Sequence, residues 1–117
     1  MFDLRITTGG LLALCAVLVL GVVGCSSYQG ARLYQSGTLA LDRGDSARAV
    51  EELERAAELV PEASEVQNHL GLAYAAAGRD DDALKAFQRA VDIDCGNLAA
   101  VENLAVAQRR HSGGNTP

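Results

Sequence analysis

Side chains that could carry acid–base or metal chemistry are few in this chain of 117 residues, and they are scattered along it. His69 and His111 have no acidic or nucleophilic companion at a recognisable spacing, so we expect both to lie on the surface. Asp80 to Asp82 lack the alternation and the glycine of a calcium loop, and they suit the capping of a helix start. We therefore predict no catalytic residues, no metal site, no cofactor and no enzymatic activity.

Three cysteines, at positions 15, 25 and 95, fit neither a disulfide framework nor a zinc site. Cys25 follows an apolar run, Leu11 to Val23, which as a helix is about 20 Å long and falls short of the roughly 30 Å core of a bilayer. A polar start with Arg5, a short apolar stretch and small residues before a cut point are typical of a secretory signal. The alternative is an uncleaved anchor that runs back through Ile6 and buries polar residues in the bilayer.

The segment Val22-Val23-Gly24-Cys25 resembles the lipobox of bacterial lipoproteins. The resemblance implies a signal peptide over residues 1–24 and cleavage before Cys25, which would carry a lipid such as palmitate. Each buried methylene would favour membrane binding by about 0.8 kcal/mol. In that family, Ser26 after the lipidated cysteine implies transport to the outer membrane, where residues 25–29 would tether the folded part to the periplasmic face.

The rest of the chain repeats itself, so that residues 30–63 align with residues 64–97 at one constant offset, which we call the repeat period. The identical pairs are Gly37 with Gly71, Gly44 with Gly78, Ala49 with Ala83, Arg55 with Arg89 and Ala56 with Ala90. Each unit is predicted to form two antiparallel helices, because apolar residues recur at spacings of three and four and a glycine ends the first helix. The small residues at matched positions let the two helices approach closely.

This pattern resembles the tetratricopeptide repeat, through Leu70, Gly71, Tyr74, Ala83, Phe87 and Ala90. The resemblance implies an all-α solenoid with repeat 1 over residues 30–63, repeat 2 over residues 64–97 and a solvating helix over residues 98–110. We expect residues 111–117 to form a disordered tail. Because such stacks usually need about three repeats, we also expect marginal stability.

The family further implies a concave surface lined by the first helix of each unit. Three rows fall on it at intervals of one repeat period: Tyr34, Asn68 and Glu102; Thr38, Leu72 and Val106; and Leu41, Ala75 and Arg109. Its mildly apolar centre and polar edges suit a peptide or a helix of a partner protein, the alternative being plain exposed helix surface. The lysine and asparagine clamp of chaperone-type members is not predicted, because Tyr34 and Thr38 occupy its first positions.

The formal net charge of -5 argues against nucleic acid as a partner. The leader and the repeats together predict a lipid-anchored scaffold that binds an envelope protein or peptide. Lipoproteins with these repeats include proteins of pilus and secretion-system assembly; the second hypothesis is an accessory subunit that regulates a cell-wall enzyme. An exposed end, near Leu33 or in the last helix, could pair with a second copy of the chain, and Cys95 could form an intermolecular disulfide.

Overall fold

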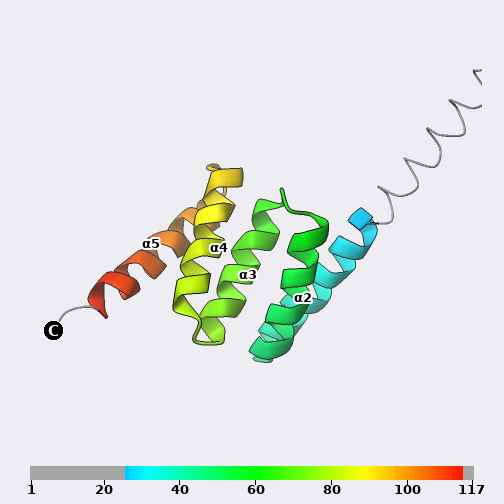
Figure 1. The fold of residues 1–117 in the computed structure, drawn as a ribbon, viewed down its shortest axis with the longest axis horizontal. Coiled ribbons are helices and arrows are strands. Elements are labelled where there is room, and N and C mark those ends of the chain that lie inside the picture. The colour runs from blue at the N-terminus through cyan, green and yellow to red at the C-terminus, as the bar shows by residue number, and fades with distance from the viewer. Residues whose placement is uncertain (1–25, 115–117) are drawn as a thin grey trace, which may run out of the picture.

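The computed structural model describes residues 26–114, and every regular element in this part of the chain is a helix (Figure 1). A first helix over residues 26–42 is followed by α2 (Ser46–Leu59), α3 (Ser64–Ala76), α4 (Asp80–Ile93) and α5 (Leu98–Gly113). The helices pack in chain order, α2 against α3, α3 against α4 and α4 against α5. The predicted all-α stack of two helix pairs and a final helix is therefore confirmed.

The predicted signal peptide (residues 1–24), the lipidated Cys25 and residues 115–117 lie outside the described residues. Within residues 26–114, none of the helices combines the length and the apolar character needed to cross a membrane.

Two glycines end the first helix of each pair in the same backbone conformation. Gly44 and Gly78 have φ angles of 77° and 73°, in the left-handed region where only glycine avoids a Cβ clash. The amide that follows each glycine donates to the carbonyl five residues before it, from Asp45 to Ala40 at 2.9 Å and at 2.8 Å in the second unit. These bonds close the helix ends and let the chain turn back within a few residues.

The two helices of each pair approach so closely that the facing position must be glycine. A Cβ added to Gly37 would lie 2.6 Å from Cγ of Leu53, and one added to Gly71 would lie 2.5 Å from Cε1 of Phe87. Small and aliphatic side chains fill the rest of the core. The buried hydrophobic residues are Ala40, Ala49, Val50, Leu53, Ala56, Val66, Leu70, Ala73, Ala83, Ala86, Phe87, Ala90 and Ala100.

The start of α4 corrects the prediction that its aspartates cap the helix. The N-cap residue is Arg79, and no side chain accepts a capping hydrogen bond there. Asp80 to Asp82 lie in the first turn, where their negative charge interacts favourably with the positive end of the helix dipole. Asp82 also accepts a hydrogen bond from Arg79 Nε at 2.8 Å. Side-chain caps occur instead at α2 and α5, where Asp45 and Asn97 each accept a backbone amide hydrogen, at 3.2 and 3.1 Å.

Helix boundaries differ from the prediction at both ends of the described chain. The tether expected over residues 25–29 is helical from residue 26 onward. At the other end, α5 continues to Gly113, so the tail expected over residues 111–117 begins as helix. The physical reason is that Arg110 and His111 favour the negative end of a helix and that glycine appears only at positions 113 and 114.

Candidate functional site

A hollow of about 130 Å³ lies between α3, the start of α4 and α5, and we call it the α3–α5 groove. Three of the predicted groove residues, Leu72, Ala75 and Val106, line it. The other lining residues are Asp80, Ala83, Phe87, Asn103, Ala107 and Arg110. Because Ala83 and Phe87 are buried, they form an apolar floor. The groove therefore joins an apolar centre to a rim with one negative and one positive side chain.

In the first predicted row, which is Tyr34, Asn68 and Glu102, two of the three side chains make contacts between helices and do not line an open surface. Asn68 is only 5% exposed, and its side-chain oxygen accepts a hydrogen bond from Asn103 Nδ2 at 2.9 Å. Tyr34 is half-buried, with its hydroxyl 3.2 Å from Nδ1 of His69 and its ring edge-on to the imidazole at 5.2 Å between centroids. Glu102 alone in this row is exposed.

The remaining predicted residues do not line the α3–α5 groove. Thr38 is half-buried, and its hydroxyl donates to the Gln35 carbonyl at 3.0 Å. Leu41 packs against the buried core cluster. Arg109 is exposed, and its Nε donates to the Ala105 carbonyl at 3.2 Å. The structure thus gathers one part of the predicted surface, on α3 and α5, around a single hollow.

Both histidines have partners on other helices that the sequence reasoning missed, Tyr34 on the first helix for His69 and Asp81 on α4 for His111. His69 is half-buried, and its Nδ1 lies 2.9 Å from the Glu65 carbonyl. Since a carbonyl only accepts, a hydrogen bond at this distance requires the ring hydrogen on Nδ1. His111 is exposed, with Nδ1 3.3 Å from the Asp81 carboxylate on α4. His69 keeps part of its surface exposed, and through Tyr34 it joins the first helix to α3.

Within residues 26–114 no group of three or more histidine, cysteine, aspartate or glutamate residues is arranged to hold a metal ion. Cys95 is an exposed free thiol in the turn between α4 and α5. Its intermolecular disulfide stays a prediction.

A polar cluster around Tyr74 ties α2 to α3 and to the turn before α4. The Tyr74 hydroxyl donates to Glu54 Oε1 at 2.7 Å, and the Arg79 guanidinium lies 4.5 Å from the centre of the tyrosine ring. Burial, followed by the hydrogen bond to Glu54, raises the pKa of Tyr74 to about 12. The neutral phenol is therefore stabilised in this setting, and its bonding indicates a structural role.

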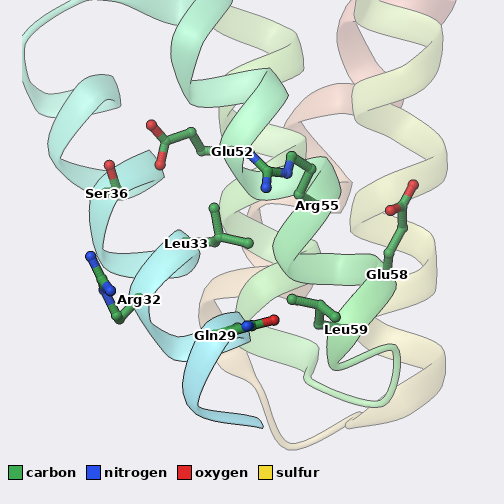
Figure 2. A pocket seen from close by; sticks show the side chains of 8 residues that line it. All are labelled: Gln29, Arg32, Leu33, Ser36, Glu52, Arg55, Glu58 and Leu59. Carbon is green, nitrogen blue, oxygen red and sulfur yellow. The ribbon is translucent and has the colours of Figure 1, made fainter. Parts of the chain in front are cut away.

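A second and larger hollow, of about 590 Å³, opens between the first helix and α2, and we call it the cap groove (Figure 2). Its lining residues are Gln29, Arg32, Leu33, Ser36, Glu52, Arg55, Glu58 and Leu59. Glu52 accepts from Arg48 Nε at 2.9 Å, and its hydrogen bonds with Ser36 and Arg48 lower the pKa of the carboxyl. Of these residues the sequence analysis singled out only Leu33, as an exposed end that could pair with a second copy.

Comparison with the second repeat shows what the cap groove is. Moved on by one repeat period, the positions of Ser36 and Glu52 become those of Leu70 and Ala86. Leu70 and Ala86 are buried in one cluster with residues of α2, which lies over them. In the first repeat no described helix takes the place of α2, and the same positions are polar. The cap groove thus has the polar outer face that the end of a repeat stack needs in water.

A family model described as tetratricopeptide repeat matches residues 34–100 of the chain. The match runs from within the first helix to the first turn of α5, and it includes both close glycine contacts. The comparison with curated proteins gives no match.

Proposed function

Because the chain belongs to the tetratricopeptide-repeat family, we propose that it is a protein-binding scaffold held on the periplasmic face of the bacterial outer membrane by a lipid on Cys25. Repeats of this family generally act as interaction modules without catalytic activity. Beyond this general role, we propose which surface of the chain binds, what kind of partner it takes and how the chain is attached to a membrane.

The α3–α5 groove is the surface that supports partner binding best, and its open apolar wall carries the proposal. Val106 is 39% exposed, Leu72 is half-exposed, and both line the hollow above the buried Phe87 ring. A partner side chain that entered the hollow would bury apolar surface at about 25 cal/mol per Å². This gain suits a modest-affinity contact with one or two anchoring residues.

The rim of the groove indicates the chemistry of the partner. Asp80 lies at the start of α4 and Arg110 in the last turn of α5, so the hollow has a carboxylate and a guanidinium among its lining groups. A peptide or helix with an apolar residue flanked by both signs of charge would match this arrangement. The proposed partner is therefore an envelope protein that presents such a segment.

Membrane attachment rests on the leader and on the position of the first helix. Val22-Val23-Gly24-Cys25 has the residue types of a lipobox, and the described chain is helical from residue 26 onward. A lipid on Cys25 would hold the repeats close to the bilayer surface, because few residues separate them from it. Two or more acyl chains would make dissociation slow.

The attachment is tested by growing cells that express the full chain with labelled palmitate. The proposal expects label in the wild-type protein and none in a Cys25→Ala variant, with Cys95→Ala as the control that keeps its label. Equal labelling of the Cys25→Ala and wild-type proteins would mean that Cys25 does not carry the lipid anchor.

Partner binding is tested by purifying the tagged full chain from membranes with its bound proteins. Leu72→Glu places a charge in the apolar wall and should remove the specific partner, while Ala47→Glu adds the same charge at an exposed site on α2. Pilus or secretion components among the lost proteins would favour a role in assembly. Cell-wall hydrolases or synthases would favour the regulatory role instead.

A further inference from the structure

One face of α5 is left uncovered by the other described helices. It carries Leu98, which is 73% exposed, Val101, which is 39% exposed, and then Ala105, Gln108 and Ser112 at spacings of three and four. We call these five residues the α5 stripe. In Figure 1 α5 lies at the end of the stack opposite to the first helix. At the edge of the stripe, Gln108 borders a shallow hollow beside α4.

The repeat explains what kind of neighbour this face is built for. Gly37, Gly71 and Ala105 follow one another at intervals of one repeat period. Each of the two glycines faces a large side chain of the next helix, Leu53 or Phe87, at a distance that leaves no room for a Cβ. Ala105 is the small residue at the same place in the third unit, and it is exposed. The α5 stripe is therefore the face on which a repeat packs its second, antiparallel helix.

We propose that a second copy of the chain supplies this helix, so that two α5 helices pair in antiparallel orientation around Ala105. The small side chain at the centre lets the two axes come close, although less closely than the matched glycines allow inside the stack. The apolar ends of the two stripes, Leu98 and Val101, then cover the polar ends, Gln108 and Ser112, of the other copy.

The charges beside the stripe favour a second copy as the occupant. Glu102 precedes Ala105 by three residues and Arg109 follows it by four, and both lie on the same side of the stripe in a helix of about 3.6 residues per turn. In an antiparallel pair centred on Ala105, Glu102 of one copy is offset along the axis by only about 1.5 Å from Arg109 of the other. Twofold symmetry forms this ion pair twice, so the surface is complementary to itself.

The exposed side chains beside the α5 stripe already suit this contact. Both Glu102 and Arg109 are exposed, and Arg109 lies back along its own helix toward Ala105, with Nε bonded to the Ala105 carbonyl. Its two terminal nitrogens remain for a carboxylate across the twofold axis. The pairing depends neither on the proposed lipid nor on the proposed partner, so it stands or falls separately from them.

Disulfide crosslinking at the twofold axis gives the first test. The full chain with Cys15, Cys25 and Cys95 replaced by serine is purified in mild detergent, and Ala105→Cys is compared with Ala47→Cys, an exposed alanine on α2. Because residue 105 faces its own copy, Ala105→Cys should give a disulfide-linked dimer as its main product on mild oxidation. The same low dimer yield from both variants would overturn the proposal.

Charge reversal gives the second test and does not alter the core. Glu102→Arg and Arg109→Glu each create two like-charged contacts and should weaken the dimer roughly tenfold in sedimentation equilibrium of the same cysteine-free chain. The double variant restores opposite charges and should recover the wild-type dissociation constant. A wild-type chain that stays monomeric at high concentration, or a double variant as weak as the single ones, would contradict the pairing.

Discussion

The ring of Phe87 lies against the backbone of Gly71, so closely that a Cβ on the glycine would be 2.5 Å from the ring. This contact joins α3 to α4 and sets their separation. Leu53 covers Gly37 in the same way one repeat period earlier, at 2.6 Å. In each repeat, therefore, a glycine on the first helix contacts a large side chain on the second, and this contact sets the distance between the two helices.

Gly71→Ala should destabilise the fold, because the added methyl overlaps the Phe87 ring. We expect a loss of about 1–3 kcal/mol in the free energy of unfolding, measured by urea denaturation. Gly113→Ala is the control, since a Cβ there meets nothing within 4 Å. Adding Phe87→Leu to Gly71→Ala should recover part of the loss; a Gly71→Ala protein as stable as wild type would contradict the close packing.

Asn97→Ala should loosen α5 selectively. Asn97 caps α5 through the Ala100 amide at 3.1 Å, and its Nδ2 donates to Ser64 Oγ at 2.9 Å. Losing the cap alone costs about 0.5–2 kcal/mol. Hydrogen exchange should therefore speed up in the amides of α5 and stay unchanged in α2. Ser112→Ala removes only an exposed bond within α5 and should not do this; uniform exchange in both variants would argue against the role of Asn97.

Stability should fall in alkaline solution through Tyr74. The folded protein holds the phenol proton up to about pH 12, whereas the unfolded chain releases it near its ordinary pKa of 10.0. The stabilising effect is therefore complete below pH 10 and is lost as the pH rises toward 12. Tyr74→Phe keeps the ring and should flatten this part of the curve of urea midpoint against pH, whereas Tyr28→Phe, at a 66% exposed residue, should not. An equally steep fall in Tyr74→Phe would assign the effect elsewhere.

The chain should self-associate through the cap groove if the polar residues there are replaced by their counterparts in the second repeat. Arg32→Val, Ser36→Leu and Glu52→Ala copy Val66, Leu70 and Ala86, which are buried in the second unit. The triple variant exposes an apolar face made to receive a helix, so light scattering should show concentration-dependent association that the wild-type face does not cause. Unchanged scattering would mean that the polar residues are not what keeps this end in solution.

The fold could be predicted because its determinants are local and periodic. Gly44 and Gly78 mark the turns, and the pairs of small and large residues mark the contact faces, all at one repeat period. The start of α4 was harder, since three aspartates in a row suit both an N-cap and a first turn. The side chain that occupies the N-cap, Arg79, has no cap-forming oxygen.

The site was predicted only in part, because the repeat period gives the direction of a side chain and not its depth. Leu72 and Val106 do lie on one hollow, whereas Asn68 is closed off by Asn103 of α5. The pairing of Tyr34 with His69 depends on how two helices cross, which the periodicity leaves open. The polar lining of the cap groove becomes meaningful only beside its buried counterpart in the second repeat.

Site-specific photocrosslinking in living cells shows directly whether the α3–α5 groove binds a partner protein. A photoreactive phenylalanine is placed at Leu72, at Val106 or, as the control, at Ala47 in the full chain. We expect one and the same adduct from positions 72 and 106, its loss when Ala75→Glu is added, and no such adduct from position 47. An identical adduct from all three positions, or none from the two groove positions, would mean that the groove does not bind a partner.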